Sequence, residues 1–370
     1  MLNAFRAFRA FRAFTTFPSM PLRIAIVFDT PYPANWGHDE HVKQMDDEFA
    51  GRINVPEPEM EYQVAHALRE NGHDIHLIGL RGDLGELIRR LTEWKPELVF
   101  NCCEGFGGDD NLEYVVPSML EALGVCYVGS PPLGLMVSRN KGLSKKVLAH
   151  HGIKVPGFII CYPGEAPPHT GDLTFPMIVK PMETDASQGI SQASVVHDAE
   201  ALAERVAFVH QQFQQPAIAE EFVEGRELYV SVIGNRDKLE ILPLTELVFD
   251  KEKNAPEERI ATKAAKWHEG YRERRGIRNQ FARPIAAQTR ETIEHVCRTA
   301  FRLLWLRDYA RCDVRLAPDG QVWLLEANAN PYIANGHDFA ESADKSGLNY
   351  TALIQRLVET ALERHGHTHA

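Results

Sequence analysis

Two short strands joined by a tight turn, within residues 313–328, place the strongest limit on how this chain can fold. Apolar residues alternate there as in a half-buried hairpin, at Val314, Leu316, Val322 and Leu324. Pro318-Asp319-Gly320 supplies the residue types of the turn. Because strand residues two apart share a face, Glu326 and Asn328 point the same way, and the neighbouring strand brings Asp313 alongside. The sequence therefore predicts a sheet that gathers two carboxylates and an amide at one point.

These three side chains, Asp313, Glu326 and Asn328, predict a divalent metal site. Oxygen ligands without His or Cys suit Mg²⁺, which keeps waters and takes further ligands from substrate phosphates. The alternative is an ordinary solvated hairpin with acids at its ends. Glu-x-Asn alone does not decide between the two interpretations.

Two lysines stand where they can bind phosphate. Lys180 ends a short apolar strand, and the loop after it, residues 182–189, offers backbone N–H groups and the hydroxyl of Ser187 to the same anion. Lys141 opens a predicted helix. The Gly-x-x-x-x-Gly-Lys-Ser/Thr pattern of a P-loop is absent. Lysines also cap strands without further function, so this segment alone is a weak signal.

A strand, a turn and a second strand over residues 217–228 fit a nucleoside. An adenine edge needs one acceptor and one donor from a backbone hinge, which Glu220, Glu221 and Val223 can supply. A ribose needs a nearby carboxylate, and Glu227 follows the turn. The segment therefore favours a nucleotide over an isolated phosphate.

Taken in order, these segments resemble the ATP-grasp superfamily and, within it, the D-alanine:D-alanine ligases. The resemblance extends from about Leu98 to the helix at 353–360. It runs through Phe106-Gly-Gly-Asp-Asp-Asn-Leu-Glu113, Tyr127-Val-Gly-Ser130, Ser138-Arg-Asn-Lys141, Ile178-Val-Lys-Pro181, Glu220 to Glu227, Ala264-Ala-Lys-Trp267, Arg311-Cys-Asp-Val314 and Leu325-Glu-Ala-Asn-Ala-Asn-Pro331. It implies an α/β fold in which an N-terminal parallel-sheet domain precedes two α+β subdomains that clasp ATP.

The resemblance also implies a role for each matched residue. Asp313, Glu326 and Asn328 would hold two Mg²⁺ ions, with Glu326 bridging them and Mn²⁺ as an alternative ion. ATP would be contacted at its phosphates by Lys141, Lys180 and Lys266, at adenine by Glu220, Glu221 and Val223, and at ribose by Glu227. Arg311 would stabilise the oxyanion of a tetrahedral intermediate, and Ser187 would act in the loop over the phosphates. The implied reaction is ATP-dependent joining of a carboxylate to an amine through an acyl phosphate, with release of ADP and phosphate.

The sequence departs from these ligases where they bind amino acids. Their Glu-Arg/Lys-Glu-Val-Ser type segment, whose acid grips the first ammonium, is missing after the strand 22–28, and Ala186 replaces a serine. Tyr332 replaces a glycine, His337-Asp338 replaces Ser-Leu, and Trp267 replaces a tyrosine. We therefore expect Trp267, Tyr332 and His337 to contact a substrate pair other than two D-alanines.

Two alternatives remain open. A genuine D-alanine:D-alanine ligase would need a displaced ammonium-binding acid, for which Glu59 and Glu61 are the candidates. A catalytically silent nucleotide-binding protein would have lost one of the four catalytic and metal residues. All four are present: Asp313, Glu326, Asn328 and Arg311.

The chain of 370 residues is expected to divide into a tail at 1–20, an N-terminal α/β domain at 21–130, a central subdomain at 131–223 and a C-terminal subdomain at 224–370. The alternation of strands and helices from Leu22 predicts a parallel sheet with helices on both faces. Ser191–Val196 is predicted as a strand. The charged segment Asp250–Arg283 is predicted as a loop that forms a lid.

A net charge of −11 argues against nucleic acid as a partner, and no apolar run approaches the ~18 residues of a membrane span. Six cysteines without a Cys-x-x-Cys pair indicate a reduced, cytoplasmic protein. The expected partners are small-molecule acids and amines, and a homodimer fits the resemblance. The basic repeat at 5–14 is expected to be a disordered tail, or to precede a true start at Met20.

Overall fold

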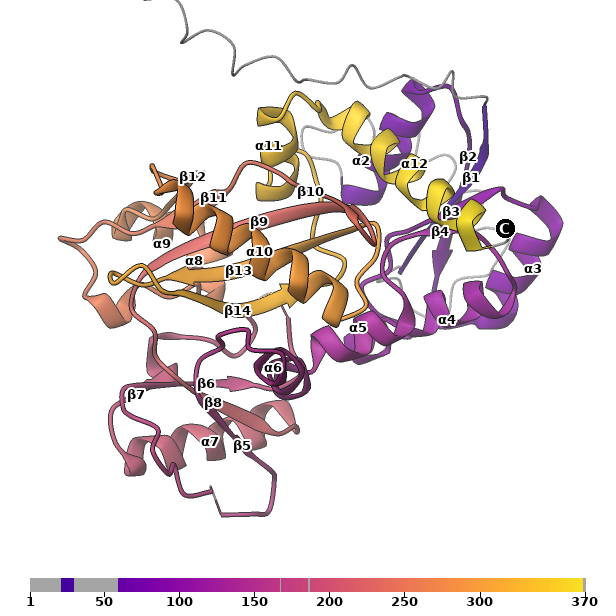
Figure 1. Cartoon of the computed structure of the whole chain (residues 1–370). Helices are drawn as coiled ribbons and strands as arrows, with labels where there is room; N and C mark the ends of the chain where they lie inside the picture. Colours follow the sequence, from indigo (N-terminus) through magenta and orange to yellow (C-terminus); the bar gives the residue numbers. More distant parts are fainter. Residues whose placement is uncertain (1–20, 30–58, 167, 186, 369–370) are drawn as a thin grey trace, which may run out of the picture.

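The computed structural model describes residues 21–29, 59–166, 168–185 and 187–368. Three sheets organise these residues (Figure 1). The N-terminal repeat, Ala186 and most of the acid-rich stretch before Glu59 lie outside the described residues. Among the described residues, no helix is long and apolar enough to cross a membrane. All six cysteines are buried and free, as predicted for core residues.

The first sheet is parallel, as the strand and helix alternation predicts. Its strand order is β2-β1-β3-β4. The strands are β1 (Arg23–Asp29), β2 (Asp74–Leu80), β3 (Leu98–Asn101) and β4 (Tyr127–Val128). The helices are α2 (Met60–Glu70), α3 (Leu84–Trp94) and α4 (Val115–Ala122), followed in the chain by α5 (Pro132–Arg139). Both faces of the sheet are buried, because apolar clusters form on each side of β1.

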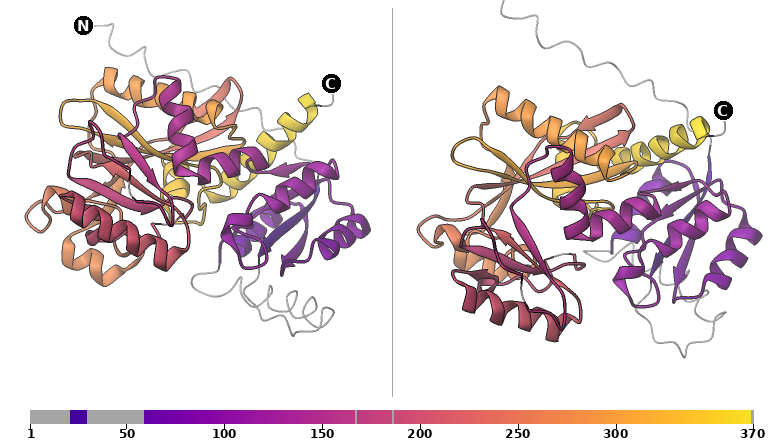
Figure 2. Two further views of the ribbon diagram at one scale, coloured as in Figure 1. Left: turned by 90° about the horizontal axis from the view of Figure 1, so that it is seen from below. Right: turned by 60° about the horizontal axis from the view of Figure 1, so that its bottom comes forward.

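Two helices from the other end of the described chain complete the core of this first sheet. They are α11 (Asp338–Lys345) and α12 (Tyr350–Thr368). Leu353 and Leu357 of α12 are fully buried in one cluster with Ile24 and Phe100 of the sheet. Figure 2 shows α12 extending from the C-terminal part of the molecule along the N-terminal elements. The helix therefore joins regions that are distant in sequence.

The second sheet is antiparallel, with strand order β5-β8-β6-β7. Its strands are β5 (Phe158–Cys161), β6 (Met177–Pro181), β7 (Val195–Val196) and β8 (Ala217–Glu221), and its helices are α6 (Lys141–His150) and α7 (Ala199–Phe213). The prediction of a strand over Ser191–Val196 is wrong in its first half, where Gln192–Ser194 forms a 3₁₀ turn. Ser194 Oγ accepts from the Ser191 N–H at 3.1 Å, and such local side-chain bonds compete with strand pairing.

The third and largest sheet has the order β12-β11-β9-β13-β14, with β10 paired to β9. Its strands are β9 (Arg226–Asn235), β10 (Lys238–Ile241), β11 (Thr245–Val248), β12 (Arg278–Phe281), β13 (Tyr309–Leu316) and β14 (Val322–Asn328). Helix α10 (Ala287–Leu303) packs on it. The segment predicted as a lid loop instead folds into two short helices, α8 (Lys263–Trp267) and α9 (Glu269–Arg275), before β12. The domain limits at 130/131 and 223/224 stay predictions.

Candidate active site

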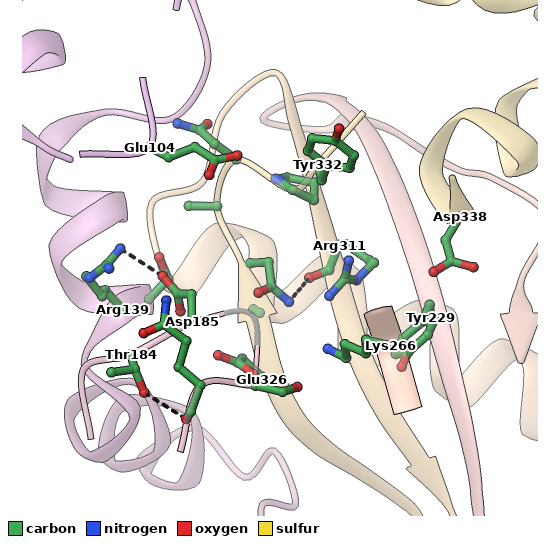
Figure 3. Close-up of a pocket in the computed structure, with 18 of the residues that line it drawn as sticks. Glu104, Arg139, Thr184, Asp185, Tyr229, Lys266, Arg311, Glu326, Tyr332 and Asp338 are labelled. Carbon is green, nitrogen blue, oxygen red and sulfur yellow. Dashed lines mark hydrogen bonds and ion pairs between the residues drawn. The ribbon is translucent and has the colours of Figure 1, made fainter. Parts of the chain in front are cut away.

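A cleft of about 470 Å³ lies where the three sheets meet (Figure 3). Its walls come from the N-terminal domain, the α5–α6 junction, the loop after β6, the α8 segment and the ends of β13 and β14. Nine of the predicted site residues line it: Lys141, Ser187, Lys266, Trp267, Arg311, Glu326, Asn328, Tyr332 and His337. The other six are not among the lining residues: Lys180, Glu220, Glu221, Val223, Glu227 and Asp313.

The predicted hairpin is present, and it places its polar residues on one face. β13 and β14 are antiparallel, with Asp313 opposite Glu326 and Arg311 opposite Asn328. Opposed residues on neighbouring strands point to the same side of a sheet. The register shifts directly after Asp313, so that Val314 faces Leu324. This β-bulge ends the regular pairing at the site, as bulges beside functional centres do.

Arg311 forms a two-pronged ion pair with Asp313. Its Nε and Nη2 donate to the two carboxylate oxygens at 2.7 Å and 3.0 Å. The guanidinium also lies 4.9 Å from the ring centre of Tyr229, a buried residue of β9. Burial lowers the pKa of Arg311, but Asp313 outweighs this and holds it above its usual range. Arg311 therefore stays charged, with further N–H donors available to the cleft.

Glu326 is kept ionised by three lysines. Its Oε1 lies 3.2 Å from Lys141 Nζ. Burial opposes ionisation, but Lys141, Lys266 and Lys180 together lower its pKa to about 2. Lys141, at the first position of α6, is itself buried. Glu326 and Lys141 thus form an ion pair in the cleft wall, and the charges of Lys266 and Lys180 further stabilise the carboxylate.

Sequence reasoning missed Lys145. It lies one turn after Lys141 on α6, almost fully buried, with Nζ 3.4 Å from Glu220 Oε1 and 2.6 Å from the backbone oxygen of Leu325. Lys180 pairs with the other oxygen of Glu220 at 2.9 Å. Burial raises the pKa of Glu220, but Lys145 and Lys180 lower it overall. The i, i+4 spacing of the two lysines on one helix is the signal that could have identified the second one.

Of the four residues predicted to contact adenine and ribose, the three glutamates already have partners within the protein. Glu220 is turned inward to Lys145 and Lys180, and Glu221 Oε1 accepts from the Thr174 N–H at 2.9 Å. Glu227 is buried and pairs with Arg315 at 2.8 Å. Val223 is half-buried in the turn between β8 and β9. The roles of these residues toward adenine and ribose stay predictions.

The three predicted substrate residues come together at the mouth of the cleft. The rings of Tyr332 and His337 lie 4.8 Å apart, and that of Trp267 lies 6.3 Å from the first and 6.0 Å from the second. Trp267 is 51% exposed. It comes from α8, whereas the other two follow β14. This aromatic triad therefore joins α8 to the loop beyond the hairpin.

Carboxylates surround Tyr332. Burial raises the pKa of its hydroxyl, and Glu104, Glu61 and Glu59 raise it further. Glu104 lines the cleft. Burial, reinforced by Glu59, raises the pKa of Glu61 to about 7. Glu104 and Glu61 could thus take the place of the ammonium-binding acid that is absent after the first strand.

The donor set fits Mg²⁺ carried by a nucleotide. Asp313 and Glu326 supply two carboxylates, and Asn328, whose Nδ2 lies 3.3 Å from Asp313 Oδ1, supplies an amide oxygen. Among the residues placed by the structure, no three His, Cys, Asp or Glu side chains converge as a metal site of their own. The phosphates of a bound nucleotide would therefore complete the shell. Metal binding by these residues stays a prediction.

Fold and cleft together define an ATP-grasp enzyme that forms carbon–nitrogen bonds. A family model described as the D-ala D-ala ligase C-terminus matches residues 147–359. The uncharacterized protein y4sG of Sinorhizobium fredii is 32% identical over 318 residues, 84% of this chain and 89% of that protein. The chain belongs to the D-alanine–D-alanine ligase family.

Other relatives agree in fold and length. A D-alanine–D-alanine ligase of Aquifex aeolicus is 27% identical over 295 residues, 80% of this chain and 92% of its own. The crystal structure of D-alanine–D-alanine ligase from Bacillus anthracis complexed with ATP aligns with a TM-score of 0.69 at 21% identity, over 94% of this chain and 99% of that one. The likeness to the Bacillus anthracis structure concerns the fold alone.

Proposed function

We propose that this protein is an ATP-dependent carboxylate–amine ligase that forms an amide or dipeptide bond through an acyl phosphate, on a substrate pair other than two D-alanines. The observation that carries the first part is the shared face of β13 and β14. It presents Arg311, Asp313, Glu326 and Asn328 together, beside Lys141. A catalytically silent nucleotide-binding protein would be expected to lose one of these four residues, and all four are present.

Before the amine can attack, the negative charge of the ATP phosphates must be neutralised. Transfer of the γ-phosphoryl group is promoted by cations placed around the phosphates, and Lys141, Lys180 and Lys266 converge on Glu326. Mg²⁺ ions held with the nucleotide by Asp313, Glu326 and Asn328 would supply further charge neutralisation. We propose two such ions, with Mn²⁺ as a substitute.

In the second step, the amine nitrogen attacks the acyl phosphate carbon and inorganic phosphate leaves. Negative charge develops on the former carbonyl oxygen. Arg311 lines the cleft and stays charged, so its free N–H groups can stabilise that oxygen. Ser187, also in the cleft wall, has a positive φ of 61°, and we propose that it acts in the loop over the phosphates.

The aromatic triad supports a pair other than two D-alanines. A tyrosine at 332 occupies space that a glycine leaves open, and the rings of Trp267 and His337 meet it edge-on, with ring centres 6.3 Å and 4.8 Å away. Large rings favour flat or apolar groups over a methyl group. We therefore expect at least one substrate with a side chain larger than that of alanine.

One observation favours a genuine D-alanine:D-alanine ligase as the second candidate. Glu104 and Glu61 lie close enough to Tyr332 to raise its pKa. Either carboxylate would offer an ammonium the charge-assisted hydrogen bond that the missing segment provides in the relatives. The names of relatives such as the Aquifex aeolicus ligase point the same way.

The deciding experiment measures phosphate release and amide formation by the purified protein with ATP and Mg²⁺. A panel of amino acids and other carboxylates and amines is tested pairwise, D-alanine included. Amide formation that is fastest with a pair other than two D-alanines supports the proposal. D-alanyl-D-alanine formation that no other pair exceeds supports the second candidate. ATP binding without turnover on any pair contradicts both.

A further inference from the structure

Three consecutive residues at the α5–α6 junction contact three consecutive residues of the loop after β6. We call this loop the flap, and the structure describes it at residues 182–185 and 187–189. Arg139 pairs with Asp185 at 2.8 Å, Asn140 Nδ2 donates to Glu183 Oε1 at 3.1 Å, and Lys141 Nζ donates to the backbone oxygen of Thr184. Figure 3 shows Arg139 pointing at Asp185 across the cleft wall. These contacts hold the flap beside Lys141, the lysine that is predicted to bind the ATP phosphates.

Arg139 also reaches away from the flap. Its Nη1 lies 3.3 Å from Glu113 Oε2, and its Nε donates to Asn111 Oδ1 at 3.3 Å. Both partners belong to the segment before α4 in the N-terminal domain. The side chain of Arg139 is only 11% exposed. One guanidinium therefore connects the N-terminal domain to the flap of the central sheet.

The charge of Asp185 explains why this connection matters. Its carboxylate lies 3.9 Å from Lys141 Nζ, the same ammonium that approaches Glu326. Burial, together with Glu326, holds the pKa of Asp185 above its usual value, although Lys141 and Arg139 counteract this. Without Arg139, the carboxylate would rely on Lys141 for its counter-charge. It would then compete with a phosphate for that lysine and repel the nucleotide.

We propose that Arg139 is a positioning residue for the nucleotide reaction. By pairing with Asp185 it fixes the flap against the phosphate site and leaves Lys141 available to ATP. The inference rests on the proposed function, because it assumes that Lys141 binds phosphate. Arg139 itself acts through Asp185 and is not expected to touch the reacting atoms.

The test compares Arg139→Met, Arg139→Lys, Asp185→Asn and the double variant Arg139→Met/Asp185→Asn with the wild-type chain. Arg307→Met is the matched control, because Arg307 pairs with Glu121 of the N-terminal domain at 2.8 Å and does not line the cleft. Hydrogen exchange of the flap amides and calorimetric ATP binding are measured without any second substrate. The KM for ATP, kcat, and the ratio of phosphate to amide released are measured with the best substrate pair.

We expect Arg139→Met to raise flap exchange, weaken ATP binding and raise the KM for ATP by about tenfold, a typical size for coupling between two sites. The kcat should change less, and more phosphate should appear without amide. Arg139→Lys should recover most of the loss. The double variant should bind ATP better than Arg139→Met, because it no longer contains the Asp185 carboxylate that would compete for Lys141. Arg307→Met should match the wild type.

Additive losses in the double variant, or equal losses in Arg307→Met, would show a general structural role and overturn the proposal. Unchanged flap exchange and ATP binding in Arg139→Met would overturn it as well. If Arg139→Met does not fold, Arg139→Lys and Asp185→Asn carry the same comparison of ATP binding. Failure of the proposed function has a different signature, because no pair would then yield an amide even with the wild-type chain.

Discussion

Lys145 and Glu220 form an ion pair in which both side chains are nearly inaccessible to solvent, 2% and 1% exposed. Removing one partner of a buried pair is costly, because the other charge is left without its full compensation. Lys145→Met should lower the free energy of unfolding by about 3 kcal/mol. Urea denaturation measures this loss. Lys154→Met is the control, because Lys154 is exposed and its ammonium contacts two uncharged side chains, Gln321 at 2.7 Å and the ring of Trp323 at 5.7 Å. A loss no larger than in that control would contradict the structural importance of the pair.

Glu326→Gln should abolish substrate-dependent ATP turnover and leave the fold intact. The change removes the charge that faces Asp313 across the hairpin and that the bound Mg²⁺ ions would share. Circular dichroism checks the fold, and phosphate release measures turnover. Turnover at the wild-type rate in a folded variant would exclude Glu326 as a metal ligand.

Arg311→Ala should slow amide formation about a hundredfold, because loss of one oxyanion donor typically costs ~3 kcal/mol. ATP affinity should change much less. The two parameters are separated by steady-state kinetics with ATP varied. A large fall in ATP affinity with an unchanged rate at saturation would place Arg311 in the nucleotide site instead.

D-alanine alone should stimulate ATP hydrolysis poorly in the wild-type chain. Tyr332→Gly should raise the kcat/KM for D-alanine. The change removes one ring of the aromatic triad and opens space beside Glu104. Trp267→Phe, which keeps an aromatic ring in the triad, serves as the control. If Tyr332→Gly leaves the relative rates on D-alanine and on the best pair unchanged, Tyr332 does not determine specificity.

Glu113 predicts a pH dependence of stability. Burial, together with Asp185, raises its pKa to about 8, against the lowering effects of Arg139 and Asn330. Between the pKa of an ordinary carboxyl and about 8, the folded chain therefore keeps a proton that the unfolded chain has released, so stability falls as pH rises through this window.

Glu113→Gln removes that fall. The variant should gain stability relative to the wild type at pH 9 compared with pH 5, by on the order of 4 kcal/mol, because each of about three pH units contributes about 1.4 kcal/mol. Denaturation at both pH values measures the difference. The same relative stability at pH 5 and pH 9 would show that Glu113 titrates normally.

The hairpin and its polar face were predictable because they depend on local rules. Alternation and the Pro-Asp-Gly turn define the strands, and residues two apart must share a side, so Glu326 and Asn328 follow directly. The parallel first sheet follows from the alternation of strands and helices in the same way. The resemblance further identified nine residues that line one cleft.

The remaining features depend on contacts between distant parts of the chain. The pairing of Arg139 with Asp185 and of Glu227 with Arg315 needs the strand register and the packing of two sheets, which no local pattern encodes. Lys145 had a local signal, its spacing from Lys141, but only its burial shows its importance. The strand predicted at Ser191–Val196 is wrong in its first half, because a serine side chain offers the backbone a competing turn.

The packing of α12 against the first sheet has a consequence during synthesis on the ribosome. Asn71 Nδ2 donates to the Thr351 carbonyl at 3.0 Å and His73 bonds Gln355 at 2.8 Å, contacts that span about 280 residues. The N-terminal sheet therefore emerges with an apolar face that α2 covers only in part until nearly all of the described chain has been translated. Such an intermediate is prone to aggregate or to recruit chaperones. We expect the fragment 21–130, expressed without α12, to be insoluble, and co-expression of residues 338–368 to rescue it in part.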